Sequence, residues 1–304
     1  MWRAGLLALA AGLALGACSM VRVAYDNAPR MLLGEMDTYL ALDERQREQA
    51  LGLLETRMAR HRRVELPRYV ALLGEAERTL ADGATRAEIE MLRDRIVELY
   101  REAMAETIPA LVPVLSGLDA EQIDHLAARL EERNRELAEK YAADDPAARM
   151  QRRRERAVAR IERWTGPLRP AQVSLIEKRR DAMPFIAKDW LAYHRANQQR
   201  LLAMLRARAP RGEIAAFLDA WWVRLADRPP ALARKLAASD AAWVALLVVL
   251  DGTLDEQQRQ HVLARLESYR EGLAPLLARG IAPAPAGAPT TAAGSEIRAW
   301  SAGA

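Results

Sequence analysis

The chain has 304 residues, and its 45 Lys and Arg against 41 Asp and Glu give a formal net charge of +4 at pH 7. This near balance is not the profile of a nucleic-acid-binding protein, and the single cysteine excludes an intramolecular disulfide. Apolar residues make up 51% of the chain but only two are Phe, which favours a core of Leu, Ala and Val on helices over a β fold.

Residues 1–17 have the form of a signal peptide. Arg3 precedes an apolar run from Ala4 to Leu15 that is too short to span a bilayer. The run leads into Leu-Gly-Ala-Cys, which resembles a bacterial lipobox, whose cysteine takes a diacylglycerol and then a third acyl chain such as palmitate. The resemblance implies that Cys18 is the acylated first residue of the mature chain. An ordinary secretory signal that ends near a cysteine is the alternative.

The remaining chain divides by composition into three parts. We expect an acylated N-terminal linker over residues 18–28 and a helical domain over residues 29–278, because no Gly/Ser/Pro linker interrupts the latter. Residues 279–304 are rich in Ala, Pro, Gly and Thr and have no helical periodicity, so we expect a disordered tail. The fold class is therefore all-α, a bundle of antiparallel amphipathic helices.

Four segments share a helix-start pattern with Leu followed four residues later by Gln. In three of them, Asp at the N-cap and Gln at position N3 predict a capping box, and in the other Pro170 falls at position N1. The segments begin at Leu42, Leu118, Leu168 and Leu254. The stretches Leu118–Ala138 and Leu254–Ala274 are identical at ten of twenty-one aligned positions, which either internal duplication or convergence of amphipathic helices explains.

Helical periodicity and breaker residues predict the other elements. We expect helices over about Pro29–Leu40, Asp43–Arg63, Pro67–Leu80, Arg86–Ala105, Pro146–Trp164, Pro184–Arg208 and Gly212–Ala226, with breaks that include Pro109 and Pro113. The segment Trp243–Leu250 is apolar on every side, so we expect it to be a helix buried at the centre of the bundle.

Catalytic and metal motifs are absent from the sequence. The histidines show no metal-ligand spacing, and we expect His61 to be packed and hydrogen-bonded, with His125 and His261 facing solvent. Most acidic residues have a basic neighbour three or four positions away, which is typical of solvated helix pairs. We therefore predict a protein without catalytic residues, cofactor or metal.

Two features carry binding hypotheses. Seven arginines lie between Arg149 and Arg163, and the side formed by Arg152, Arg156, Arg160 and Arg163 is a candidate site for lipid or lipopolysaccharide phosphates. The other interpretation is a solvated helix face that Glu155 and Glu162 partly neutralise. Trp222 lies off the stripe that contains Trp221, so it is a candidate rim residue of a partner-binding groove or a partly covered edge of the core.

Two segments resemble a family of uncharacterised proteobacterial lipoproteins: Val21–Pro29, which reads VRVAYDNAP, and His61–Tyr69, which reads HRRVELPRY. The resemblance covers nearly the whole mature chain and implies a location and a helical fold, without catalytic residues. The Leu-Asp-x-x-Gln starts also resemble, more weakly, the Leu-Thr-x-x-Gln motifs of small helical periplasmic chaperones.

These observations predict a lipoprotein held in the outer membrane by acyl chains on Cys18 and facing the periplasm. The inner membrane is less favoured because Ser19, rather than Asp, follows the cysteine in the lipobox resemblance. Its expected function is non-enzymatic binding or scaffolding of an envelope protein or of non-native chains, in the manner of a chaperone. Binding of anionic lipid or lipopolysaccharide through the arginine-rich helix is the alternative.

Overall fold

A computed structural model describes residues 25–142 and 145–277, and within these ranges the chain forms helices and no strands. The predicted all-α fold is confirmed. The predicted signal peptide, Cys18 and the whole of the predicted tail lie outside the described residues. Residues 25–40 are helical, and ten labelled helices and one π-helical turn follow: α2 (Glu44–Val64), α3 (Leu66–Ala81), α4 (Arg86–Ser116), α5 (Ala120–Tyr141), α6 (Pro146–Thr165), α7 (Pro170–Asp181), α8 (Ala187–Arg206), α9 (Arg211–Leu218), η1 (Asp219–Val223), α10 (Pro230–Asp251) and α11 (Glu256–Leu277).

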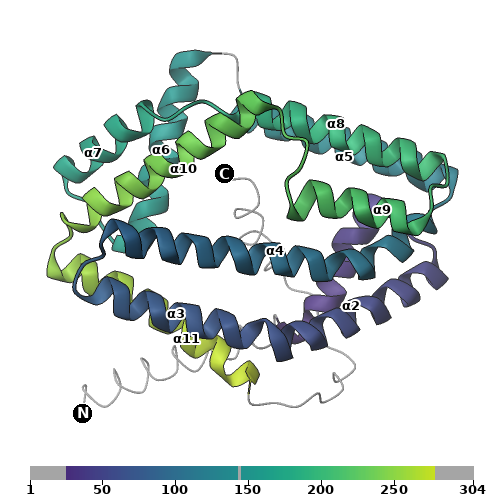
Figure 1. Cartoon of the computed structure of the whole chain (residues 1–304), viewed down its shortest axis with the longest axis horizontal. Coiled ribbons are helices and arrows are strands. Elements are labelled where there is room, and N and C mark those ends of the chain that lie inside the picture. Colours follow the sequence, from purple (N-terminus) through teal and green to yellow (C-terminus); the bar gives the residue numbers. More distant parts are fainter. Residues whose placement is uncertain (1–24, 143–144, 278–304) are drawn as a thin grey trace, which may run out of the picture.

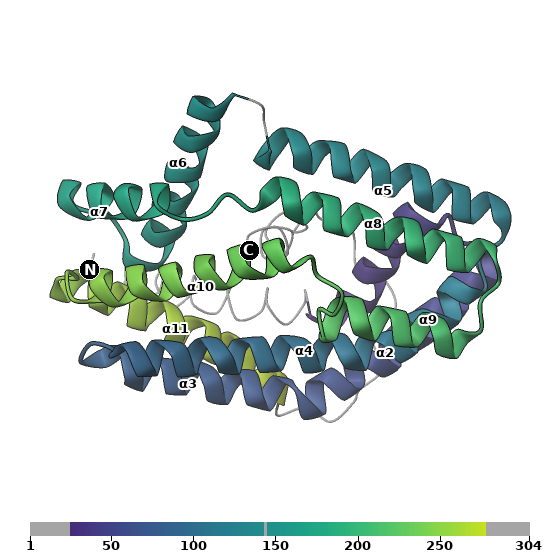
Figure 2. The ribbon, with the colours of Figure 1, turned by 45° about the horizontal axis from the view of Figure 1, so that its top comes forward.

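Antiparallel helix pairs form the edges of the molecule. α3 pairs with α11 and α4 lies beside α3 along one long edge, while α5 pairs with α8 along the other (Figure 1). α6 and α7 pack on each other at one end, and α10 runs from α8 toward α11 (Figure 2). This arrangement brings α5, α6, α7 and the start of α8 together at one place, where the candidate site lies.

Two separate groups of buried apolar residues form the core. The larger is built around α2, α4, α5, α8 and α9 and includes Leu42, Leu118 and Leu218. The smaller lies between α6, α7 and α10 and includes Ile161, Ile176 and Leu246. The leucines of the first two helix starts are therefore buried in the larger core, which agrees with their expected place against the first turn of a helix.

The four helix starts meet in pairs through their glutamines. Gln46 and Gln122 exchange two side-chain hydrogen bonds of 3.1 and 2.6 Å, and Gln172 and Gln258 exchange two of 2.9 and 3.0 Å. Each glutamine oxygen also accepts the backbone N–H of its own N-cap residue, as the capping pattern predicts. We call the first pair the first clasp and the second pair the second clasp.

Each clasp glutamine also donates to the backbone carbonyl of the residue just before the leucine of the other helix start in its pair. Gln122 donates to the carbonyl of Ala41 at 2.9 Å, and Gln258 donates to that of Pro167 at 2.8 Å. In the reverse direction Gln46 donates to the carbonyl of Gly117 and Gln172 to that of Thr253, each at a distance of 3.1 Å. Every glutamine therefore uses both its oxygen and its amide protons, which a glutamate could not do.

Two predicted breaks are wrong, because α4 continues through Pro109 and Pro113. A proline inside a helix costs about 3 kcal/mol, since it removes a hydrogen bond and crowds the preceding turn. The same stretch buries four apolar side chains, Ile108, Val112, Val114 and Leu115. At about 1.5 to 3 kcal/mol each, their burial offsets the two prolines.

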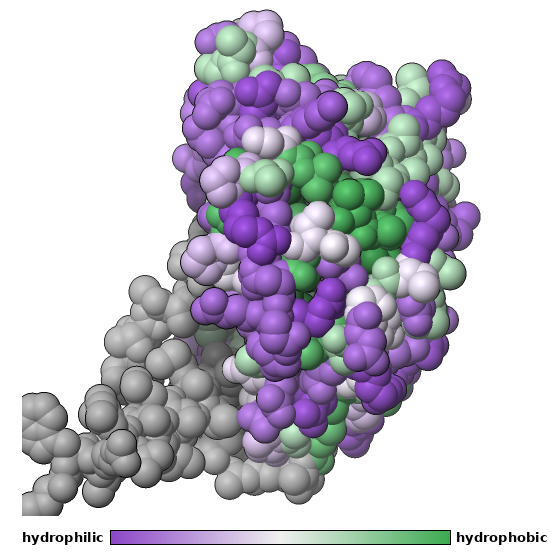
Figure 3. Space-filling view, turned by 90° about the vertical axis from the view of Figure 1, so that its left-hand side faces the viewer, coloured by the Kyte–Doolittle hydropathy of each residue, from purple (hydrophilic) through white to green (hydrophobic). Residues whose placement is uncertain are grey.

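The predicted burial of Trp243–Leu250 is also wrong, although the segment is helical as expected. Val244, Leu246 and Leu250 are buried, while Leu247 and Val249 are 40% and 39% exposed. α10 packs chiefly against α4 and α7, so part of its surface has no neighbour. Figure 3 shows apolar residues ringed by hydrophilic ones on the side of the molecule where α7 and α10 lie.

The predicted helix over residues 212–226 ends early. α9 stops at Leu218 and passes into the π-helical turn Asp219–Val223. Such a turn inserts an extra residue into the helical repeat, which a regular hydrophobic period does not reveal. Ile214, Phe217, Leu218 and Trp221 nevertheless form one buried apolar side of this segment.

Candidate arginine cavity

α5, α6, α7 and α8 enclose a cavity of about 220 Å³, which we call the arginine cavity. α6 starts at Pro146 because Asp145 caps it, accepting the N–H of Ala147 at 2.9 Å. α7 ends at Asp181, and the turn to α8 carries Met183 to Ile186 past α6. The cavity is lined by Arg133, Asn134, Leu137, Tyr141, Arg153, Arg156, Arg180, Pro184, Phe185, Ile186, Ala187, Trp190, Leu191, His194 and Gln198.

Arg153 and Arg156 come from α6 and are held by backbone oxygens and aromatic rings. The Arg153 guanidinium donates to the carbonyls of Met183 and Pro184 at 3.0 and 3.2 Å, and Arg153 is only 6% exposed. Arg156 donates to the Lys140 carbonyl at 3.2 Å, and its guanidinium carbon lies 4.9 Å from the centre of the Tyr141 ring. These contacts orient both cations without neutralising them.

Arg180 reaches the same cavity from the last turn of α7. Its guanidinium carbon lies 5.5 Å from the centre of the Trp243 ring. Burial, together with the positive charges of Arg153, Arg160 and Arg156, lowers the pKa of Arg180 to about 10. Arg180 is therefore still protonated at neutral pH, in a place where further positive charge is unfavourable.

Carboxylates are absent from the described lining of the cavity. The nearby Asp181 is bound by Arg154, whose Nε donates to it at 2.8 Å and lowers the pKa of its carboxyl. Among the described residues, Arg133 is the one lining arginine in a direct ion pair, with Glu136 at 2.8 Å. The cavity thus keeps a positive charge that an anionic ligand would neutralise.

His194 and three aromatic side chains supply the other wall. The His194 ring lies 4.3 Å from that of Trp190, measured between centres, and burial lowers the pKa of His194 to about 4. Its Nε2 atom is buried without a hydrogen-bond partner. His194 is therefore neutral at pH 7, and the charge of the cavity comes from its arginines.

Only one of the predicted anion-site residues lines this cavity. Arg156 does, whereas Arg160 and Arg163 are exposed on α6 and Arg152 is half-buried outside the lining. The predicted stack followed one helix face, but the cavity is completed by Arg153 one turn earlier on a neighbouring face and by Arg180 from α7. The sequence around Arg180 shows only a basic helix end, so no local signal points to it.

The other candidates lie elsewhere. Trp222 is half-buried against the larger core, with its ring 5.7 Å from that of Trp221, and does not line the neighbouring cavity of about 320 Å³ that Trp221 and Phe217 line. His61 lies 2.7 Å from the Tyr25 hydroxyl, packed as expected, and His125 and His261 are exposed.

Two further features are absent from the described part of the chain. No helix in it is long and apolar enough to cross a membrane. It also brings together no group of three or more His, Cys, Asp or Glu side chains suited to a metal ion.

Residues 38–219, more than half of the chain, match the model of a family of unknown function, DUF6279. No curated protein and no solved structure matches the chain.

Proposed function

The chain belongs to a family without an established function, and we propose from its own residues that it is a lipid-anchored, non-enzymatic binding module of the bacterial envelope. Its ligand is an anionic amphiphile with a phosphate group, held in the arginine cavity. The observation that carries the proposal is a cavity with four arginines and no carboxylate in its described lining. Arginine binds phosphate oxygens in pairs, and such charge-assisted bonds are stronger than neutral ones.

The apolar part of the lining supports an amphiphile over a free inorganic anion. Leu137, Ile186 and Leu191 face the same cavity as the arginines. Its volume of about 220 Å³ is below the 300 to 1,000 Å³ typical of sites that enclose drug-sized ligands. The cavity therefore suits a phosphate and the adjoining few atoms of a larger molecule. Phospholipids and lipopolysaccharide both carry this chemistry.

The anchor remains a proposal from the lipobox resemblance at Cys18. We propose that the acyl chains hold the protein at the periplasmic face of the outer membrane, since two or more chains are enough for stable anchoring. We also propose, from the resemblances in the sequence, that the protein is a proteobacterial lipoprotein and that it is related in its helix starts to periplasmic chaperones. A protein partner bound at Trp222 ranks second, because neither of the two cavities described above includes that side chain.

Substitution of Arg180 tests the binding site. We expect Arg180→Gln to weaken binding of dihexanoyl phosphatidic acid, kept below its micelle concentration, at least tenfold in isothermal titration calorimetry. The matched control is Arg179→Gln, because Arg179 is exposed on the same turn of α7 and its loss changes the net charge equally. Binding should also weaken with salt, since the interaction is electrostatic.

Three results separate the alternatives. Equal effects of the Arg180 and Arg179 variants would show a general charge effect and overturn the site. Inorganic phosphate that binds as tightly as the lipid would remove the role of the apolar wall. Comparison of phosphatidic acid with a phosphorylated glucosamine disaccharide lipid then distinguishes phospholipid from lipopolysaccharide as the source of the phosphate.

A further inference from the structure

One corner of the body contains the first described residue, the α2–α3 junction and the end of α11. The Tyr25 hydroxyl lies 2.7 Å from Nδ1 of His61, and Arg62 donates to Asp26 at 2.7 Å. α11 runs antiparallel to α3, since Arg259 bonds to the Leu80 carbonyl and Arg270 to Glu77. α11 therefore ends beside the beginning of α3, and α11 also contacts α2. We call this place the basal corner.

Exposed apolar side chains lie on the three helices that meet at the basal corner. Leu32, Val64 and Leu277 are 43%, 44% and 38% exposed. Leu32 lies in the helix that begins at Tyr25, Val64 is the last residue of α2, and Leu277 is the last of α11. Arg30, on the same helix as Leu32, and Arg63, next to Val64, are exposed, and their side chains form no hydrogen bond or ion pair with the described residues.

The length of chain before Tyr25 limits what this corner can face. Seven residue steps separate Cys18 from Tyr25, and each extended residue spans at most about 3.5 Å, so the connection reaches about 25 Å. Acyl chains on Cys18 lie in the hydrocarbon region of a bilayer. The basal corner then stays within about 25 Å of the headgroups.

We propose that the basal corner rests on the membrane that holds Cys18. Leu32, Val64 and Leu277 lie at the headgroup boundary, and Arg30 and Arg63 face lipid phosphates. Apolar residues flanked by arginine are typical of surfaces that lie in a membrane interface. The inference rests on the proposed lipid anchor.

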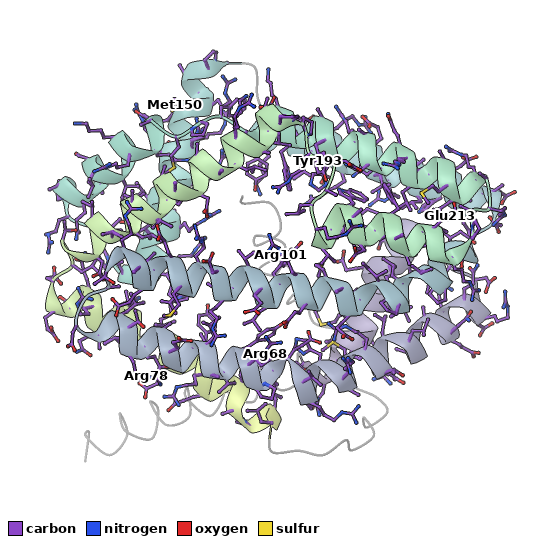
Figure 4. The ribbon with its side chains drawn as sticks, in the orientation of Figure 1. Arg68, Arg78, Arg101, Met150, Tyr193 and Glu213 are labelled. Atoms are coloured by element: carbon purple, nitrogen blue, oxygen red, sulfur yellow. The ribbon has the colours of Figure 1, made fainter. Side chains whose placement is uncertain are left out.

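This orientation places the arginine cavity away from the anchoring membrane. Figure 4 shows Met150, on the same helix as Arg153 and Arg156, at the edge of the molecule opposite Arg68, which follows the α2–α3 junction. Headgroups of the anchoring bilayer then do not reach the cavity. Its ligand is an amphiphile that has left that membrane or is presented from elsewhere.

Site-directed fluorescence on the acylated full-length protein tests the orientation. The thioether at Cys18 leaves no free thiol, so a single added cysteine takes the fluorophore. We would compare Val64→Cys and Leu277→Cys with Ala147→Cys, an exposed control on α6, in phosphatidylglycerol vesicles containing a nitroxide on the lipid headgroup. We expect at least threefold stronger quenching at positions 64 and 277 than at position 147.

The other outcomes overturn the proposal in different ways. Equal quenching at the three positions, while the protein floats with the vesicles, would leave the anchor intact and reject the basal corner. Fluorophores at positions 64 and 277 that are shielded from an aqueous quencher but not quenched by lipid would assign the corner to a second protein copy or another partner. A protein that does not float with vesicles would remove the anchor itself.

Discussion

Arg180 and His194 line one cavity but differ in charge at neutral pH. The pKa of Arg180 falls to about 10 and that of His194 to about 4, in both cases first because of burial. Burial disfavours the charged form of either group, yet only the histidine starts close enough to neutrality to lose its proton. The charge of the cavity is therefore constant over the physiological pH range.

The buried histidine makes stability depend on pH. Its pKa is lower in the folded protein than the ordinary 6.5, so the unfolded chain binds more protons between pH 6.5 and 4. Stability is then fully present above pH 6.5 and is lost as pH falls toward 4, by on the order of 1 to 3 kcal/mol for a half-buried group. Urea unfolding at pH 7.5 and 5.0 measures the difference.

We expect His194→Gln to reduce this pH-dependent loss. His261→Gln is the matched control, because His261 is exposed and its replacement should leave the loss unchanged. An unaltered difference between the two pH values in the His194 variant would contradict the assignment.

At the scale of elements, the clasps explain why each of the four helix starts has a glutamine four residues after its leucine. The capping boxes were predictable, because the N-cap and N3 residues lie within one turn. The pairing of Gln46 with Gln122 and of Gln172 with Gln258 was not, since 76 and 86 residues separate the partners. The aligned segments after Leu118 and Leu254 are the second partners of the two clasps, so they occupy equivalent places in the two pairs.

Loss of one clasp glutamine should destabilise the fold. Gln258 is 5% exposed and bonds to Gln172 and to the Pro167 carbonyl. We expect Gln258→Ala to lower the free energy of unfolding by about 2 to 4 kcal/mol, because buried polar partners are left unsatisfied. The adjacent and exposed Gln257→Ala should change it by less than about 0.5 kcal/mol. Similar midpoints for both variants in urea would reject a stabilising role for the clasp.

At the scale of the whole molecule, the proposed membrane location depends on Cys18, which precedes the described residues. We expect Cys18→Ser to move the protein from the membrane to the soluble periplasmic fraction, because no acyl chain can then be attached. Cell fractionation with immunodetection measures the change, and Ser19→Ala serves as a control that keeps the cysteine. Membrane retention of the Cys18 variant would reject the anchor.

The sequence alone determined the helical class, the capped helix starts, the surface position of His125 and His261, and the packing of His61. These follow from interactions within a few turns of one helix. The tertiary structure decided that α4 continues through its prolines, because long-range burial of Ile108 and Val112 outweighs a local rule. It also decided the exposure of Leu247 on α10, since an apolar segment is buried only where a neighbour covers it. The arginine cavity was also decided by the tertiary structure, because Arg156 and Arg180 come together only when α6 packs on α7.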